Sequence, residues 1–215
     1  MTNTEMTTKL NFLLEDTGDA NFSGASKFSA LNTAQRMVAN LLHESYLTEL
    51  EYKDTVGITG SSGLVTMDGA SANNKSAKVP IRNSIRNFQT VISGTYRYAI
   101  NIPFSDVKKI ENTYLGADVD NPVFWVFGNN LHFRPITNVT SVVIYYLIEP
   151  ADIDSSNSCV LNVALHDIVV DVAEAELWRM DNKSDRSSLA RQSAMDQIKI
   201  LNDRYAMEAP TGVNK

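Results

Sequence analysis

The sequence predicts an α+β fold: a helical bundle formed by a long N-terminal helix and two antiparallel C-terminal helices, with an inserted antiparallel β-sheet and a long projecting loop. Apolar residues recur at helical spacing towards both ends of the chain, and their spacing changes to two between residues 88 and 150. Separate runs of helices and strands are typical of α+β proteins. With 215 residues, 43% of them hydrophobic, the chain can bury a core, so we expect a single domain over residues 1–215.

The N-terminal part predicts a short helix, a turn-rich loop and then the long helix. Leucines on one side of residues 8–14 indicate the short helix, and residues 16–26 are rich in turn formers. Ser26 or Ser29 can cap the long helix, whose apolar residues recur at helical spacing through about Asp54.

A glycine- and serine-rich segment occupies residues 57–80. Its glycines are Gly57, Gly60, Gly63 and Gly69. Loops of this length are rare in compact domains unless they are functional or ordered by a partner. We therefore expect a projecting arm, with room for a short hairpin around residues 64–67.

Residues 88–150 form the expected sheet. Strands are indicated at residues 88–92, 94–103, 107–114 and 140–149, and the segments 123–127 and 131–135 flank a hairpin signal at Gly128. A polar linker is expected at residues 151–158. Residues 159–207 then predict two antiparallel helices joined by a short turn, and residues 208–215 predict a mobile polar tail.

Charge and cysteine content exclude several classes of protein. The net charge of −6 disfavours a protein that coats DNA by neutralising phosphates. Cys159 is the only cysteine, so an internal disulfide and a cysteine-rich metal site are excluded. It stands where a helix is expected to begin, so the helix dipole could lower its pKa, but a structural role is favoured. The longest apolar run, residues 142–148, is too short to cross a bilayer, so no membrane partner is expected.

No catalytic constellation stands out, and we expect no enzyme activity, no cofactor and no metal. Metal-ligand spacing is absent around the three histidines, His43, His132 and His166. Asp167, Asp171 and Glu174 follow i, i+4, i+7 spacing, so they line one helix face. That row leaves a metal-dependent enzyme as a minor alternative, although such rows more often face solvent or another subunit.

Aromatic residues crowd the expected sheet; they are Tyr96, Tyr98, Phe124, Trp125, Phe127, Phe133, Tyr145 and Tyr146. Core packing and cross-strand pairing explain them most simply. A stacking platform is the alternative, so a carbohydrate- or receptor-binding module of a tail stays open, with Trp125 as the residue to test.

The order of these segments resembles bacteriophage head-to-tail adaptor proteins, also called connector or neck-ring proteins. Residues 31–41, Leu-Asn-Thr-Ala-Gln-Arg-Met-Val-Ala-Asn-Leu, are similar to their first long helix, and residues 94–103, Gly-Thr-Tyr-Arg-Tyr-Ala-Ile-Asn-Ile-Pro, to a strand that ends in proline. Residues 131–135 and 142–150 are similar to the next hairpin and the central strand. Residues 165–178, Leu-His-Asp-Ile-Val-Val-Asp-Val-Ala-Glu-Ala-Glu-Leu-Trp, resemble the penultimate helix.

The resemblance covers residues 27–205 and implies a structural virion protein. Such proteins form a ring, usually of twelve copies, beneath the portal, join the head to the tail and continue the DNA channel. The implied partners are other copies of the chain, the portal protein and a tail, nozzle or tube protein, with DNA passing without specific binding. The implied location is the neck or tail region of a virion assembled in the host cytoplasm.

Two sets of residues are candidates for these contacts. Candidates for docking on portal or tail lie on the arm and near the C-terminus: Gly57, Gly60, Gly63, Leu64, Met67, Lys75, Lys78, Tyr205 and Met207. Candidates for the contact between subunits lie on polar helix faces: Arg36, Glu44, Glu49, Asp167, Asp171 and Glu174.

Overall fold

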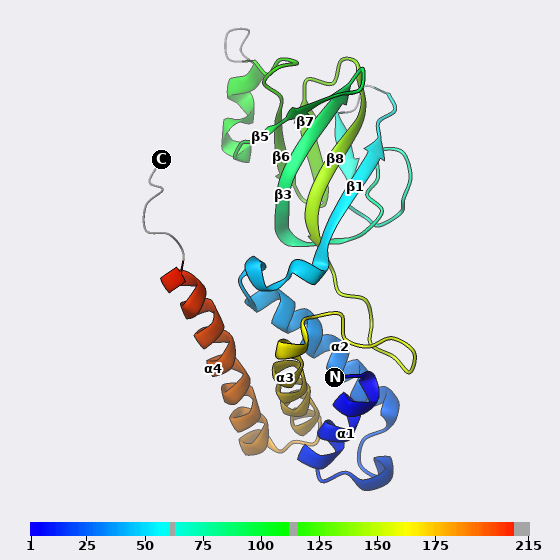
Figure 1. Cartoon of the computed structure of the whole chain (residues 1–215), viewed down its shortest axis with the longest axis vertical. Coiled ribbons are helices and arrows are strands. Elements are labelled where there is room, and N and C mark those ends of the chain that lie inside the picture. The colour runs from blue at the N-terminus through cyan, green and yellow to red at the C-terminus, as the bar shows by residue number, and fades with distance from the viewer. Residues whose placement is uncertain (61–62, 112–115, 209–215) are drawn as a thin grey trace. The chain divides into compact units, whose positions relative to one another are not determined.

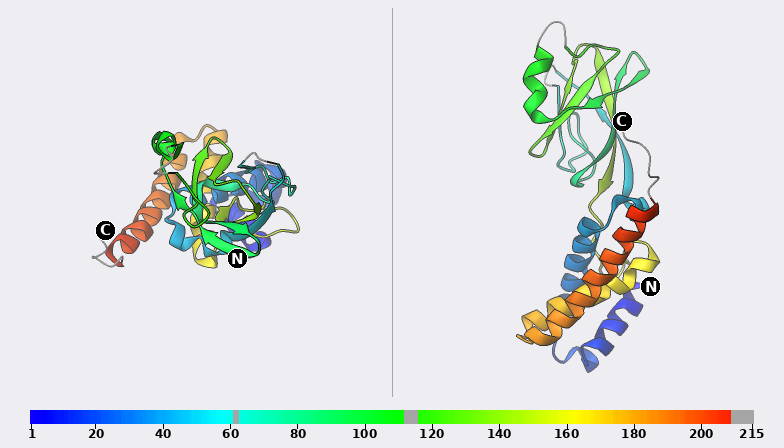
Figure 2. Two further views of the ribbon diagram at one scale, coloured as in Figure 1. Left: turned by 90° about the horizontal axis from the view of Figure 1, so that it is seen from above. Right: turned by 90° about the vertical axis from the view of Figure 1, so that its left-hand side faces the viewer.

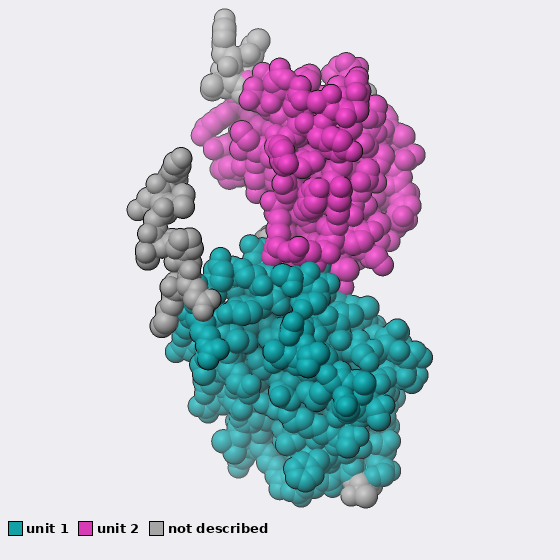
Figure 3. All heavy atoms as spheres, in the orientation of Figure 1, with its two compact units in different colours: residues 1–50, 150–215 teal, residues 51–149 magenta. Residues whose placement is uncertain are grey.

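The chain is mixed α and β, as its sequence predicts, but it divides into two compact units where we expected one domain. The structure is a computed structural model that describes residues 1–60, 63–111 and 116–208 (Figure 1). Residues 1–50 and 150–215 form a helical unit, and residues 51–149 form a β unit (Figure 3).

Four α-helices make up most of the described helical unit. They are α1 (Asn3–Leu13), α2 (Gly24–Leu41), α3 (His166–Met180) and α4 (Ser184–Glu208). α3 contacts the other three, and α4 runs alongside it (Figure 2). Buried apolar residues occur all round α3, as expected for a helix that packs against neighbours on several sides; they include Ile168, Val169, Val170, Val172, Ala173 and Leu177.

The first two helices differ from their predicted bounds. α1 begins at Asn3 because Thr2 and Glu5 form a capping box, in which each side chain accepts a bond from the other's backbone N–H. α2 is capped by Ser23 and ends at Leu41, so the prediction of a helix through Asp54 is wrong.

Two short 3-10 helices, Glu44–Tyr46 and Thr48–Leu50, connect α2 to strand β1 (Glu51–Gly57). Leu47 and Leu50 are buried, which is why their spacing imitated a continuing helix. In β1 the buried residues Asp54 and Val56 are two apart, the spacing of a strand with one buried face.

The β unit contains two four-stranded sheets. Sheet A has the order β1-β8-β3-β4, with β3 at Pro80–Ile92, β4 at Thr95–Tyr98 and β8 at Val139–Ile148. Sheet B has the order β2-β7-β6-β5, with β2 at Leu64–Thr66, β5 at Ile100–Asn101, β6 at Val123–Phe127 and β7 at Asn130–Arg134. Among the described strands, every pair is antiparallel except β5–β6.

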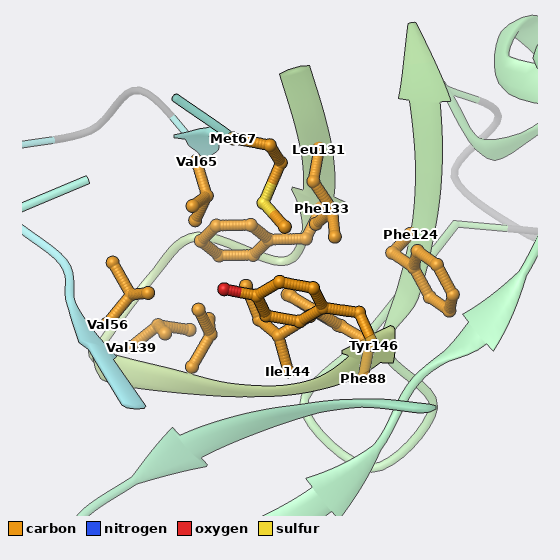
Figure 4. Close-up of a cluster of buried hydrophobic side chains, with 11 residues drawn as sticks. Val56, Val65, Met67, Phe88, Phe124, Leu131, Phe133, Val139, Ile144 and Tyr146 are labelled. Carbon is orange, nitrogen blue, oxygen red and sulfur yellow. The ribbon is translucent and has the colours of Figure 1, made fainter. Parts of the chain in front are cut away.

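The core of the β unit lies between the two sheets. Phe88 of sheet A packs against Phe124 and Phe133 of sheet B, with ring centroids 5.1 and 5.6 Å apart (Figure 4). Ile144 and Leu131 are fully buried beside them. These contacts join the faces of two sheets, as in a β-sandwich.

Some predictions for the sheet are confirmed and others are wrong. The single strand expected at 94–103 is divided between β4 of sheet A and β5 of sheet B. The hairpin around Gly128 is β6–β7, and the buried strand at residues 140–149 is β8. Residues 88–92 are only the end of β3, which turns into β4 through Ser93 and Gly94, both at positive φ. Instead of a strand at 107–114, residues Phe104–Glu111 form a 3-10 helix, and 112–115 lie outside the described residues.

The segment at 57–80 packs into the β unit more than a projecting arm would. β2 pairs with β7, so the suggested hairpin within residues 64–67 does not form. Val65, Met67 and Ser76 are buried. The Thr66 N–H donates to the Asn74 carbonyl oxygen at 2.8 Å, so the later part of the segment is fastened to β2.

At the C-terminal end, the expected helix pair is α3 and α4, and α3 begins later than predicted. Cys159 lies outside any helix, and burial raises the pKa of its thiol, so a helix dipole does not activate it. α4 extends to Glu208, and the rest of the expected tail, 209–215, lies outside the described residues. None of the described helices has the length and apolar character needed to cross a membrane.

Candidate interaction surfaces

The acidic row of α3 is engaged by other helices of the same chain. The Lys9 ammonium of α1 lies 2.6 Å from the Asp167 carboxylate. Asp171 accepts a 3.0 Å hydrogen bond from Gln197 of α4. Two members of the row, Asp171 and Glu174, are half-buried. The row therefore serves packing within one chain, and of its three members only Asp167 is exposed as a subunit contact would require.

The surroundings of this row do not favour metal chemistry. Burial raises the pKa of Asp171 and of Glu174, while the Gln197 and Trp178 hydrogen bonds oppose that rise. A metal site needs several carboxylates that converge on one point. Among the described residues, no three His, Cys, Asp or Glu side chains come together to hold a metal ion.

The other candidate subunit contacts lie on the surface of the helical unit. Arg36 pairs with Asp152 at 2.5 Å, which fastens α2 to the chain after β8. Glu49 accepts a 2.9 Å hydrogen bond from Asn162. Glu44 is exposed in a 3-10 helix. Arg36 and Glu49 thus make contacts within the chain as well as facing solvent.

The candidate docking residues on the arm range from buried to exposed. Met67 is buried and Leu64 is half-buried, so Met67 does not present its side chain to a partner. The exposed group consists of Gly60 and Lys78. Gly57, Gly63 and Lys75 are at most partly exposed; Lys75 pairs with Asp68 at 2.7 Å.

Near the C-terminus, Tyr205 stacks on His43, with ring centroids 3.5 Å apart, at the end of α4. That contact joins α4 to the segment after α2, so Tyr205 has a packing role within the chain. Met207 lies in α4, and its side chain is outside the described residues.

The remaining aromatic and histidine candidates are mostly buried. Trp125 is only 6% exposed and stacks on His132, so it does not offer a face to a sugar ring. His166 is buried, with Nε2 2.8 Å from the Leu161 carbonyl oxygen and Nδ1 2.9 Å from the Met1 amino nitrogen. Both ring nitrogens are occupied, which leaves neither for a metal.

Among the described residues, exposed apolar side chains include three sets on separate surfaces; the sequence pointed to the aromatic members Tyr96, Tyr98 and Phe127 but not to Leu189, Ile200 or Phe104. On α4, Leu189 and Ile200 are exposed; they are eleven residues apart, about three helical turns, so they share a face. At one end of the β unit, Phe104 and Phe127 stack at 4.7 Å and are both more than half exposed. The third surface is the outer face of sheet A.

Strand register defines that third surface, which we call the tyrosine face: Tyr96, Tyr98 and Tyr145. Tyr98 is opposite Gln89 and Tyr96 opposite Val91, while Tyr145 of β8 is opposite Lys53 on one side and Asn87 on the other. These residues alternate with the core-facing Ile144 and Phe88, so they lie on the outer side of the sheet.

A cleft of about 480 Å³ opens at β1, β3 and β8 next to the tyrosine face. It is lined by Glu51, Tyr52, Lys53, Arg86, Asn87, Tyr145 and Tyr146. The Lys53 ammonium lies 5.6 Å from the centroid of the Tyr145 ring, and Arg86 pairs with Glu51. A register shift at Ile85–Asn87 places Arg86 at a bulge, which re-aims its side chain.

No protein-family model and no curated protein matches this chain. The functional proposal therefore rests on the exposed surfaces described above. Leu189 and Ile200, which we call the α4 stripe, could have been found from their eleven-residue spacing, whereas Tyr96 and Tyr98 were already among the sheet aromatics expected from the sequence. The cleft could not have been found, because it depends on pairing of β1 with β8, and the sequence predicts a helix over residues 51–54 of β1.

Proposed function

We propose that this protein is a structural component of a phage virion that forms a ring beneath the portal, joins head to tail and continues the DNA channel. The observation that carries the proposal is the presence of large exposed apolar side chains on both units, on α4 and on the β unit. Apolar patches of this kind mark protein–protein contacts in soluble proteins. A ring subunit needs two such surfaces, one for each neighbour, and more for the rings above and below it.

The finer arrangement of the fold supports the same proposal. The helical unit is assembled from two distant parts of the chain, and the β unit is the stretch between them. We propose that α2, α3 and α4 form the rigid bundle that carries the ring contacts, with the β unit as an inserted module. Contacts of α3 with both α2 and α4 favour this reading.

Charge is also compatible with a DNA channel. At −6 per chain, a ring of a dozen copies carries a large negative charge, and any part of it that faces the channel repels DNA phosphates. DNA would then slide past without being held. The carbohydrate-binding alternative is less favoured, because its main candidate, Trp125, is buried.

The test is to mix the protein with purified portal assemblies and to image the mixture by negative-stain electron microscopy. The proposal predicts an additional ring of density stacked on the portal. The variant Leu189→Asp, at an exposed position of α4, tests whether the α4 stripe contributes; we expect it to reduce occupancy without changing helical content. Portal particles with no added density, at protein concentrations well above those in the assembly, would contradict the proposal.

A further inference from the structure

The cleft beside the tyrosine face carries more positive charge than its own residues neutralise. Lys53 and Arg86 supply two cations, and Glu51, which pairs with Arg86, supplies one carboxylate. Lys53 is exposed, and within the described part of the chain no carboxylate lies within 4.0 Å of its ammonium. The cleft is therefore net positive, by one charge, on a protein that is negative as a whole.

The walls of the cleft are aromatic. Tyr145 is half-buried, and its ring lies under the Lys53 ammonium. Tyr52 packs edge-on against Tyr146, with centroids 5.8 Å apart. A ligand that fits this site combines an apolar group for the tyrosine rings with a carboxylate for the Lys53 ammonium.

The β unit carries a loop with that chemistry at residues 116–121. Val119 is 41% exposed and stands between Asp118 and Asp120, which are both exposed. The Asp118 carboxylate accepts the backbone N–H groups of Asp120 and Asn121, at 2.9 and 2.7 Å, and so shapes the loop. The loop thus presents an exposed apolar side chain with a carboxylate on either side of it in the sequence.

Asp120 retains the capacity to bind a second cation. Its Oδ1 lies 3.2 Å from Arg97 Nε, and the carboxylate is 78% exposed. The Oδ2 atom has no hydrogen bond within the described residues. A carboxylate has about four acceptor positions, so one such pair leaves room for a lysine from outside.

We propose that the cleft receives the 116–121 loop of a second copy of this chain, with Val119 against Tyr145 and Asp120 against Lys53. The inference rests on the proposed ring and names one contact that builds it. Cleft and loop are different surfaces of the same β unit, so the contact is heterologous: each copy uses its loop on one neighbour and its cleft on the other. Repetition of such a contact closes into a ring when the rotation between copies permits it.

Charge reversal tests the pairing, with native mass spectrometry of the full chain across a concentration series as the readout. Lys53→Glu places two carboxylates opposite each other and is expected to raise the concentration needed for ring formation by about tenfold or more. The double variant Lys53→Glu with Asp120→Lys restores opposite charges and is expected to recover assembly. Lys108→Glu, an exposed reversal of the same sign on the same unit, is the matched control and should leave assembly unchanged.

The outcomes separate this inference from the proposed function. If Lys53→Glu assembles as the unchanged protein does, the cleft is not the contact between copies, but the proposed ring is not contradicted. Failure of the double variant to recover, or an equal loss in Lys108→Glu, overturns the pairing in the same way. If the unchanged chain stays monomeric at every concentration, both the ring and the contact are overturned. Thermal melting of each variant confirms that all of them are folded.

Discussion

Lys27 is an ammonium held inside the helical unit by two carboxylates. Its side chain is 1% exposed and lies 2.7 Å from Asp16 and 2.5 Å from Asp19, in the connection between α1 and α2. Asp16 also accepts the backbone N–H groups of Asn21 and Phe22. The Lys27 hydrogen bond is the largest cause that lowers the pKa of Asp16. This network fixes a loop whose sequence indicates only turns.

Removal of the lysine leaves a buried carboxylate without its cation. We expect Lys27→Ala to lower the free energy of unfolding by about 3–5 kcal/mol, because an uncompensated buried charge is left behind. The matched control is Lys9→Ala, whose ion pair with Asp167 is solvent-exposed and should cost less than about 1 kcal/mol. Urea unfolding at pH 7 measures both variants, and equal losses would contradict this account of Lys27.

Asp171 has the opposite electrostatic effect on stability. Burial raises its pKa in the folded state, so the ionised form opposes folding at neutral pH, and that penalty disappears as the pH falls through the folded pKa. We expect Asp171→Asn to keep the Gln197 hydrogen bond and to increase stability at pH 7 by less than about 1 kcal/mol, since the group is half-exposed.

The pH dependence provides the check. The difference between Asp171→Asn and the unchanged protein should shrink towards zero below the unfolded pKa of about 3.9, where both states are protonated. Thermal unfolding between pH 3 and pH 7 measures it. A difference that stays constant over this range would show that the effect is one of packing.

At the scale of elements, β2 depends on a glycine that no other residue can replace without strain. Gly63 has a φ of +54°, and an added Cβ would lie 2.9 Å from the Phe133 carbonyl oxygen and closer still to Ile136. Close approach of backbones is therefore what lets β2 pair with β7. Gly60 also has a positive φ, of +74°, but apart from its chain neighbours no atom of the residues that the structure describes lies within 4 Å of its Cβ position.

Alanine substitutions at Gly60 and Gly63 distinguish the cost of backbone strain from the cost of a close contact. Gly60→Ala is expected to cost about 1 kcal/mol, the usual cost of a left-handed alanine. Gly63→Ala should cost about 2–4 kcal/mol, because overpacking is added to the same backbone strain. Denaturant unfolding gives both values, and a Gly63→Ala loss no larger than that of Gly60→Ala would remove the close-contact argument.

Local signals explain which elements were predictable from the sequence. The β6–β7 hairpin and the buried strand β8 follow from turn chemistry at Gly128 and a β-branched run, and both are confirmed. The end of α2 was not predictable from apolar spacing, because Leu47 and Leu50 are buried by short 3-10 turns. The segment at 57–80 looked like an arm because its glycines signal loops, whereas the pairing of β2 with β7 that holds it joins residues far apart in the sequence.

Local sequence signals also could not predict which candidate contact residues are already engaged within the chain. Spacing on one helix placed Asp167, Asp171 and Glu174 on a common face, but it could not show that α1 and α4 contact that face. The cleft brings together β1, β3 and β8, which are far apart in the sequence. Surfaces built by pairing between distant segments lie beyond what periodicity in one segment can predict.

At the scale of the whole molecule, two units imply two separable cores. Phe88 belongs to the core of the β unit, and Val169 is fully buried in the helical unit. We expect Phe88→Ala to cost about 3–5 kcal/mol and to accelerate amide hydrogen exchange in β3, β6 and β8 but not in α3. Val169→Ala should do the reverse. Equal acceleration in both units for both variants would show one cooperative domain.

The most direct measurement of the central claim is native mass spectrometry of the purified chain over a range of concentrations, alone and with portal protein. The account predicts a closed oligomer with one discrete subunit number, either alone or bound to the portal, and a loss of that species in Lys53→Glu. A chain that remains monomeric under both conditions, at concentrations where its surfaces would be saturated, would contradict it.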